Sequence, residues 1–238
     1  MPKRSENWRT GFVKHIKILS ALSCFLLSAA MLMTVIDFCS FDLGFYEKEY
    51  KANNTESWTG MSMEDNLRAT ECLLDYLKDK RDDIRVTAMV NGVEREVFNE
   101  RETLHMVDVK ALYQNAFLVR NIMAVIGFAI MAWMIFREKM SLRAFLQAGF
   151  KEGVLATFFL IAFVAVWALA DFNAFWTQFH LFFFDNDLWL LDPNTSIMIN
   201  LFPSSFFFHL VLRIILISLV ILIAIALYAY QPWRKEKA

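Results

Sequence analysis

The sequence lacks the short motifs that identify most hydrolases, nucleotide-binding enzymes and zinc enzymes. No Gly-x-Ser-x-Gly elbow, phosphate-binding loop, His-Glu-x-x-His pair or glycine-rich dinucleotide pattern occurs in its 238 residues. Its three cysteines, Cys24, Cys39 and Cys72, are too few and too scattered for a disulfide framework, and no metal-ligand spacing of cysteine and histidine is present. An enzyme with this sequence would therefore work without an acyl-enzyme serine, a nucleotide, another cofactor or a recognisable metal site.

A strong net charge is also absent. The formal net charge is −1, which gives no reason to expect a nucleic acid partner. Apolar residues make up 57% of the chain and charged residues 21%. An ordinary soluble domain contains about 45–50% apolar residues, so this combination indicates membrane spans joined to a solvated portion.

Four apolar segments are long enough to cross a bilayer as helices, because about 20 helical residues cover about 30 Å of hydrocarbon. The first segment could also be a signal peptide, but it exceeds the usual length of about 7–15 apolar residues and no small-residue cleavage site follows it. We therefore interpret it as a span. The predicted spans are residues 18–36, 116–136, 154–171 and 206–230.

The distribution of lysine and arginine predicts the topology. The short segments 1–17, 137–153 and 231–238 carry five, four and three of these residues, whereas the loop 172–205 carries none. Short loops rich in lysine and arginine stay in the cytoplasm. We therefore expect a cytoplasmic basic tail at each end and a cytoplasmic loop at 137–153. Residues 37–115 and the aromatic loop 172–205 would then lie together on the outer side.

Residues 37–115 have the patterns of a small α+β cap. Ser62 begins an amphipathic pattern that predicts a helix ending near Lys80. Asn91-Gly92 between Arg85–Val90 and Val93–Phe98 predicts a β-hairpin, and Asn99 with Glu102 forms a capping box that predicts a new helix. The predicted fold is thus an α-helical integral membrane protein with four transmembrane helices and a small extracytoplasmic cap between the first and second.

Two polar clusters contain the candidate site residues. In the first, Arg101, His105, Asp108 and Leu112 share one face of the predicted helix because they are spaced i, i+4, i+7 and i+11. The second is the aromatic stretch 179–207, which holds one histidine and three aspartates, His180, Asp185, Asp187 and Asp192, but no lysine or arginine. Such charge within an apolar segment is tolerated near hydrocarbon only where protein or water satisfies it, which favours an interfacial site.

Histidine suits general acid–base catalysis because its unperturbed pKa of about 6.5 lies near the working pH. Asp108 would orient His105, and Asp185 or Asp187 would orient His180. Structural hydrogen bonding by the two histidines remains the alternative. For Asp192, which precedes Pro193, we favour helix capping.

Several charged and aromatic residues admit two interpretations. The charged side chains near the outer ends of the spans would either ring an outward-facing pocket or form structural ion pairs and reach the headgroups; they are Asp37, Arg120, Asp171 and Arg213. The aromatic side chains of the 172–207 region would form either an interfacial belt or a groove for acyl chains.

The two clusters together resemble a known family. The matching stretches are Arg101-Glu102-x-x-His105-Met106-x-Asp108-Val109-Lys110, His180-x-x-Phe183-Phe184-x-Asn186-Asp187-x-Trp189-x-Leu191-Asp192-Pro193 and Phe202-Pro203-x-x-Phe206-Phe207. They resemble the lipoprotein intramolecular transacylase (Lit) family over nearly the whole chain. The family has an aspartate at the position of Ser196 and often a glutamate near Ser204, so this sequence departs from it there.

The resemblance implies a specific reaction. A member of this family moves the sn-2 acyl chain of a diacylglyceryl-modified lipoprotein onto the α-amine of its N-terminal cysteine, which leaves the lyso-form lipoprotein. The two catalytic histidines of the family correspond to His105 and His180. The implied partners are diacylglyceryl lipoproteins and membrane lipid, the implied location is the outer face of a bacterial plasma membrane, and no cofactor is implied.

This chemistry explains the missing serine, because the substrate's own amine is the nucleophile. One histidine would accept the amine proton, and the other, as imidazolium, would stabilise the oxyanion or protonate the leaving oxygen. Asn186 or Arg101 would polarise the ester carbonyl. The expected supporting or substrate-binding residues are Arg101, Asp108, Lys110, Asp185, Asn186, Asp187, Trp189, Asp192, Arg120 and Arg213. The alternatives are a non-catalytic membrane module that binds a lipidated or peptide partner, and a metal-dependent hydrolase, which no signature favours.

Overall fold

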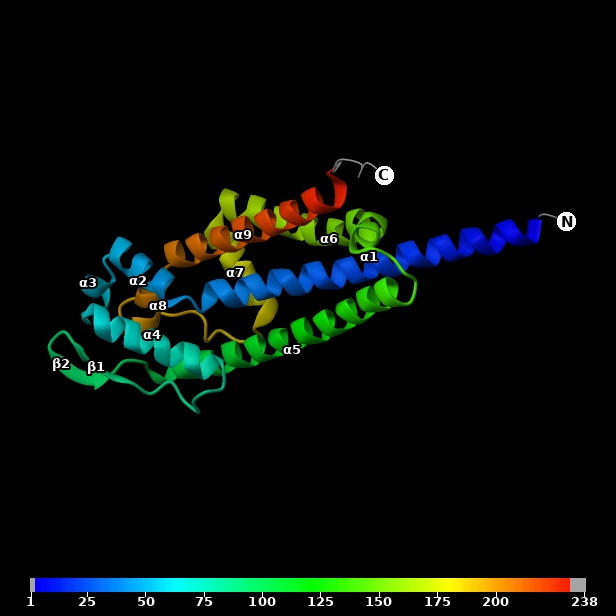
Figure 1. The fold of residues 1–238 in the computed structure, drawn as a ribbon. Helices are drawn as coiled ribbons and strands as arrows, with labels where there is room; N and C mark the ends of the chain where they lie inside the picture. The colour runs from blue at the N-terminus through cyan, green and yellow to red at the C-terminus, as the bar shows by residue number, and fades with distance from the viewer. Residues whose placement is uncertain (1–2, 232–238) are drawn as a thin grey trace. The chain divides into compact units, whose positions relative to one another are not determined.

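A computed structural model describes residues 3–231 (Figure 1). Of the predicted cytoplasmic tails, residues 1–2 and 232–238 lie outside this range. The chain forms two compact units. The first unit comprises Met1–Val35, Leu118–Ala165 and Ile214–Ala238, and the second comprises Ile36–Phe117 and Val166–Arg213.

The fold class predicted from the sequence is confirmed. Within the described residues, four helices are long and apolar enough to cross a membrane. They are α1 (Lys3–Ser40), α5 (Glu100–Phe136), α6 (Leu142–Ala170) and α9 (Ser204–Tyr230). The predicted cap helix after Asn99 and the span from 116 are one unbroken helix, α5. Because α6 begins at Leu142, the loop predicted at 137–153 is a connection of residues 137–141, and the remainder is helical.

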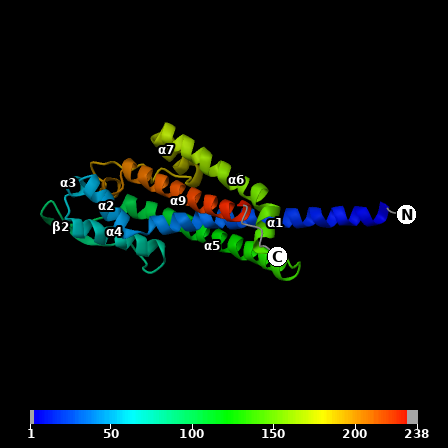
Figure 2. The same cartoon turned by 45° about the horizontal axis from the view of Figure 1, so that its top comes forward.

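Small and hydroxylated residues bring the helices of the first unit together. Figures 1 and 2 both show α1 running beside α5, and the Ser23 hydroxyl donates to the Gly127 carbonyl at 2.7 Å. Ser28 and Thr157 share a hydrogen bond of 2.8 Å between α1 and α6. In a span, where hydrocarbon supplies no hydrophobic drive for association, such contacts and close packing hold helices together.

Two glycines of α6 allow this helix to pack closely against α1. A Cβ at Gly149 would overlap the backbone of Ser20 and Ala21, and one at Gly153 would overlap the carbonyl oxygen of Ala21. The spacing Gly-x-x-x-Gly puts both on one helix face, which is a recurrent arrangement in membrane helix pairs.

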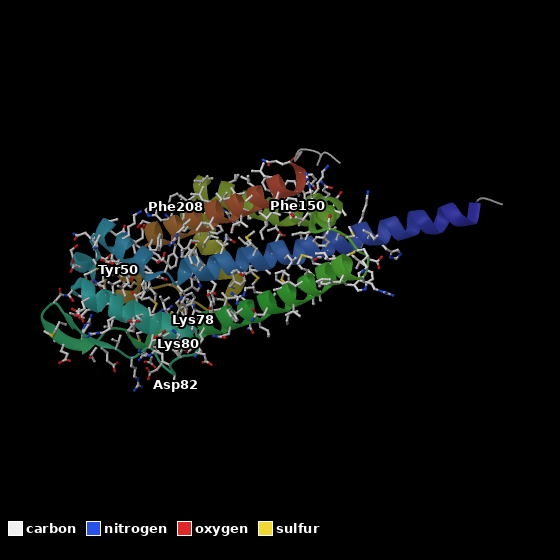
Figure 3. The ribbon with its side chains drawn as sticks, viewed as in Figure 1. Tyr50, Lys78, Lys80, Asp82, Phe150 and Phe208 are labelled. Carbon is white, nitrogen blue, oxygen red and sulfur yellow. The ribbon has the colours of Figure 1, made fainter. Side chains whose placement is uncertain are left out.

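The second unit contains the α+β cap. Its elements are α2 (Leu43–Ala52), α3 (Thr55–Thr59), α4 (Met63–Leu77), β1 (Thr87–Val90) and β2 (Val93–Glu96). The Ser62 side chain caps α4 by accepting from the Asp65 N–H, and the hairpin turn has positive φ at Asn91 and Gly92, so both local predictions are confirmed. The short helices α2 and α3 were not predicted. Figure 3 shows Tyr50 of α2, which is 1% exposed and shares a hydrogen bond with Thr70 of α4.

The segment predicted as an aromatic loop contains two helices, α7 (Phe172–Phe183) and α8 (Ile197–Leu201). Asp171 is the N-cap of α7 and accepts from the Ala174 N–H. The prediction that Asp192 caps a helix starting at Pro193 is wrong by four residues. Asp192 accepts from Asn194 and Thr195 in a turn, and Ser196 is the N-cap of α8.

The charged residues at the span ends of the second unit are satisfied in pairs or caps. Asp37 accepts from the Tyr113 hydroxyl at 2.7 Å and lies 3.7 Å from the Lys78 ammonium. Arg213 donates to the Asp42 carboxylate at 2.6 Å. Together with the cap formed by Asp171, these contacts support the interpretation as structural pairs.

We expect Gly149→Ala and Gly153→Ala to destabilise the protein. At an open helical site the same change adds about 1 kcal/mol of stability because alanine favours the helix. A loss of stability would therefore show that the new methyl group clashes with α1. Thermal unfolding in detergent measures it. Ala156→Val, which adds volume to an exposed position of the same helix, is the control. A higher unfolding temperature for both glycine variants would contradict close packing of α1 on α6.

Candidate functional site

The structure brings the two predicted histidines together within the second unit. His105 lies in the second turn of α5 and His180 in the last turn of α7. Their ring centroids are 6.2 Å apart, and Phe184 contacts both rings, with centroid distances of 5.4 Å to His105 and 5.7 Å to His180. Each histidine is only 8% exposed. Two imidazoles separated by 75 residues of sequence therefore share one largely buried site.

The backbone determines the tautomer of His180. Its Nδ1 lies 2.7 Å from the carbonyl oxygen of Trp176, one turn earlier in α7. A carbonyl can only accept, so Nδ1 must carry the hydrogen. In the neutral ring the lone pair is therefore on Nε2. The predicted orienting role of Asp185 or Asp187 is wrong, because a peptide carbonyl fills it.

Burial lowers the pKa of both imidazoles and so favours their neutral form. His105 precedes the apolar part of α5, in the cap region of the helix. Burial is the main cause that lowers the pKa of His105, to about 4, and His180 and Arg101 add to the effect while Asp108 opposes it. Burial also lowers the pKa of His180, partly offset by the bond to the Trp176 carbonyl. The Nδ1 atom of His105 is buried and has no hydrogen-bond partner among the described residues.

Two contacts hold the segment 184–191 against α5. Arg101 donates to the backbone carbonyl of Asp187 and lies 3.2 Å from its carboxylate. Seven residues along the same helix face, Asp108 accepts from the side-chain amide of Asn186 at 2.8 Å. The shared face predicted for Arg101, His105 and Asp108 is thus the face that meets this segment. Asp108 bonds to Asn186, and Nδ1 of His105 has no hydrogen-bond partner among the described residues, so the expected bond from Asp108 to that nitrogen is not observed.

Trp189 completes the aromatic surroundings of His180. Its indole N–H donates to the Asn186 carbonyl at 3.0 Å, and its ring stacks on the imidazole of His180 with a centroid distance of 4.7 Å and an interplanar angle of 27°. Trp176 and Phe179 meet the same imidazole edge to face. The histidine is therefore enclosed by rings, with one face covered by the indole.

The other predicted supporting residues lie elsewhere or have structural contacts. Lys110 pairs with Asp79 at 2.7 Å and lies over the Tyr76 ring, and Asp185 is exposed. Arg213 pairs with Asp42, and Asp192 stabilises the turn before α8. Arg120 belongs to the first unit, where its guanidinium contacts Asn121. The contacts described for Lys110, Arg213 and Asp192 are thus made with residues other than the two histidines.

Glu102 is a residue of the site that the sequence indicated only as a helix cap. Its side chain is fully buried. One carboxylate oxygen accepts from the Asn99 N–H at 2.6 Å, and the other accepts from the Ser196 hydroxyl at 2.6 Å and the Met198 N–H at 2.7 Å. The capping box therefore also fixes the start of α8 to the start of α5, three residues before His105.

The groups at the site are suited to proton transfer. No group of three or more histidine, cysteine, aspartate or glutamate side chains that could hold a metal ion occurs within residues 3–231, as far as their side chains are described. The site instead offers an unprotonated imidazole nitrogen, a second neutral imidazole and the guanidinium of Arg101, whose Nε has no hydrogen-bond partner among the described residues. A base next to hydrogen-bond donors can serve acyl transfer to an external nucleophile.

Comparison with known proteins yields one family and one group of solved structures. The family model described as lipoprotein intramolecular transacylase Lit matches residues 21–207. The fold is similar to that of the membrane-integral lipoprotein intramolecular transacylase Lit from Bacillus cereus, with a TM-score of 0.73 and 20% identity over 93% of this chain and 96% of that one. Two variants of that protein, in which a histidine is replaced by arginine or by alanine, give TM-scores of 0.69 at 18% and 20% identity. They cover 96% and 94% of this chain and 95% of theirs. No curated protein matches.

We expect Glu102→Ala to destabilise the protein by about 2–3 kcal/mol, because it leaves buried donors on α5 and α8 without an acceptor. Chemical denaturation in detergent measures the change in free energy of unfolding. Glu100→Ala, at an exposed position of the same helix turn, controls for the loss of negative charge near the helix start. Equal stabilities of the two variants would show that the carboxylate does not join the helices.

Proposed function

The chain belongs to the lipoprotein intramolecular transacylase (Lit) family and is therefore an acyltransferase, and on this premise we propose that it moves the sn-2 acyl chain of a diacylglyceryl lipoprotein onto the α-amine of the N-terminal cysteine. The observation that carries the proposal is the buried pair of His105 and His180 in a chain of this family. The substrate contains both the ester and the amine. No acyl-enzyme intermediate is needed.

We assign the base to His180, because its Nδ1 is committed to the Trp176 carbonyl and the lone pair of the neutral ring is therefore on Nε2. The amine nitrogen attacks the ester carbonyl carbon, and Nε2 takes a proton from that nitrogen. When the tetrahedral intermediate collapses, the C–O bond to glycerol breaks and the imidazolium returns the proton to the leaving oxygen. A new C–N amide bond and a free sn-2 hydroxyl result, so the protein ends in its starting protonation state.

His105 would act as a neutral hydrogen-bond donor. The sequence suggested that one histidine works as an imidazolium, but burial and the neighbouring His180 disfavour a positive charge on His105. A neutral imidazole can still polarise a carbonyl through its N–H. Arg101 is the stronger candidate to stabilise the oxyanion, because its Nε is unpaired whereas the Asn186 amide is bonded to Asp108.

Positioning supplies much of the remaining catalysis. Holding ester and amine in contact can lower a barrier by about 7–11 kcal/mol through effective molarity. The proposed supporting residues hold the segment 184–191 beside the histidine pair through the contacts described above; they are Arg101, Asp108, Asn186, Asp187 and Trp189. No cofactor takes part in the proposed reaction.

The protein is a multi-pass membrane protein, and we place the reaction at the outer face of a bacterial plasma membrane. The basic residues of segments 1–17, 137–153 and 231–238 support cytoplasmic termini, since short basic segments are retained inside. The histidine-bearing segments would then face the side on which lipoproteins are anchored. Membrane lipid surrounds the spans, and the diacylglyceryl lipoprotein is the proposed partner.

We expect purified protein to relocate the acyl group of a diacylglyceryl lipopeptide from oxygen to nitrogen. The transfer conserves mass, so fragmentation in tandem mass spectrometry must locate the chain. His180→Ala and His105→Ala should each reduce the initial rate by about 10²–10⁴-fold, the usual contribution of a general base or acid. His15→Gln is the matched control, because His15 is exposed on α1 and lies outside the second unit.

Retained transfer in both histidine variants would contradict catalysis by the pair. An unchanged diacyl substrate with folded wild-type protein would instead favour a non-catalytic module that binds lipidated partners. Loss of activity on chelation, restored by a single divalent ion, would favour a metal-dependent hydrolase.

The pH dependence of kcat/KM should show a single titration between about pH 7.5 and 6. The substrate amine, with a pKa of about 7.7–8.0, becomes protonated in this range, so the rate falls tenfold per pH unit. Burial lowers the pKa of both histidines, so we expect no second proton to bind near the ordinary histidine pKa of about 6.5. If the slope of log kcat/KM against pH increased from one to two at about pH 6.5, a histidine with an ordinary pKa would also have to be unprotonated for the reaction.

A further inference from the structure

Asn186 makes hydrogen bonds in three directions within the site. Its side-chain amide donates to the Asp108 carboxylate at 2.8 Å, and its side-chain oxygen accepts from the Leu188 N–H at 3.0 Å. Its backbone carbonyl accepts the indole N–H of Trp189 at 3.0 Å. The side-chain amide, the side-chain oxygen and the backbone carbonyl of Asn186 are therefore all bonded to protein groups, although the residue is exposed.

These bonds, together with one ring stack, connect the helix that carries His105 to the imidazole of His180. Asp108 lies three residues after His105 on α5, and Trp189 stacks on the imidazole of His180 at the end of α7. The path therefore runs from α5 through Asp108, Asn186 and Trp189 to His180. Two other contacts described above connect the segment 184–191 to the surroundings of the histidine pair. Arg101 bonds to Asp187, and Phe184 packs against both imidazole rings.

We propose that Asn186 is a positioning residue for acyl transfer: its bond to Asp108 fixes the segment that holds Trp189 on the face of His180, and so fixes His180 relative to His105. The inference rests on the proposed function. It differs from the expectation that Asn186 polarises the ester carbonyl, because the residue would act through Trp189 and not on the substrate.

The physical reason is the freedom that His180 would otherwise have. The bond from Nδ1 to the Trp176 carbonyl fixes one point of the ring, while the stacked indole restricts its tilt. A base must meet the attacking amine within a few tenths of an ångström, and a displacement of about 1 Å can cost about 10²-fold in rate. Loosening an exposed segment that carries the indole would produce such a displacement.

An exchange of the two bonded residues tests the proposal. Asn186→Asp places two carboxylates at hydrogen-bond distance, so they repel and release the segment. We expect kcat to fall about 10–100-fold with little change in KM, since the substrate contacts are kept. The double variant Asn186→Asp with Asp108→Asn restores an amide-to-carboxylate bond with its direction reversed, keeps an oxygen for the Leu188 N–H, and should recover most of kcat.

A matched control exists in the same segment of the chain. The Asn194 amide donates to the Asp192 carboxylate at 2.9 Å, so Asn194→Asp creates the same pair of carboxylates away from Trp189 and should leave kcat unchanged. Trp189→Leu should reproduce the loss seen with Asn186→Asp, and Trp189→Phe, which retains a stacking ring, should be intermediate. Thermal unfolding of each variant verifies that it is folded.

A second measurement does not depend on turnover. The indole shifts the NMR signal of the His180 Cε1–H through its ring current, and spectra of the four single histidine variants assign that signal. The shift should diminish in Asn186→Asp and return in the exchanged double variant. If the wild-type protein transfers no acyl group, the proposed function fails, and this signal still decides whether Asn186 positions His180.

Three results would overturn the inference. Full activity of Asn186→Asp would show that the bond to Asp108 has no role in positioning. An inactive exchanged variant with a restored His180 signal would assign Asn186 or Asp108 a direct contact with substrate. An unchanged His180 signal in Asn186→Asp would show that Trp189 does not depend on Asn186.

Discussion

The buried carboxylate of Glu102 is the interaction on which the site depends. It accepts three hydrogen bonds, from the start of α5 and from the start of α8. A carboxylate this deeply buried is costly unless its oxygens are well satisfied, so the two segments must come together for the charge to be tolerated. Their arrangement sets the first turns of α5, and these turns present Arg101, His105 and Asp108 on one face. The position of His105 thus depends on a contact that we assign no part in the chemistry, whereas His180 is held from α7 by the Trp176 carbonyl and the Trp189 ring.

Burial also decides how the histidines can act. An enclosed imidazole is stabilised in its neutral form, which suits the base that we propose for the transfer. The aromatic rings would then maintain the protonation state of that base as well as the shape of the site. The proposed reaction needs only one proton to move from nitrogen to the glyceryl oxygen, and the lone pair on Nε2 of His180 would carry it.

The sequence predicted those features that depend on neighbours within one or two turns. The Ser62 cap, the Asn91-Gly92 hairpin and the Asn99–Glu102 capping box all have short-range patterns, and the helix period placed Arg101, His105 and Asp108 on one face. Partners distant in sequence were not predictable. Asp108 and Asn186 are 78 residues apart, and no local pattern indicates that the Asp108 carboxylate bonds to this amide and not to the His105 ring. Helix α7 was not predicted because apolar and aromatic residues occupy most positions of its sequence, which hides a helical period. The start of α6 was predicted too late because its first turns contain basic residues. The close approach of Gly149 and Gly153 to α1 depends on a partner helix that the pattern alone does not identify.

The acceptor that orients His180 is a peptide carbonyl, and this has an evolutionary consequence. A base oriented by a carboxylate side chain can be disabled by mutating that side chain, so two positions are exposed to loss by drift. Here every amino acid at position 176 supplies the same carbonyl oxygen. With His180 as the proposed base, the ring packing around it can therefore diversify among descendants, and adapt to different acyl chains, while the tautomer of this imidazole is inherited with the helix itself.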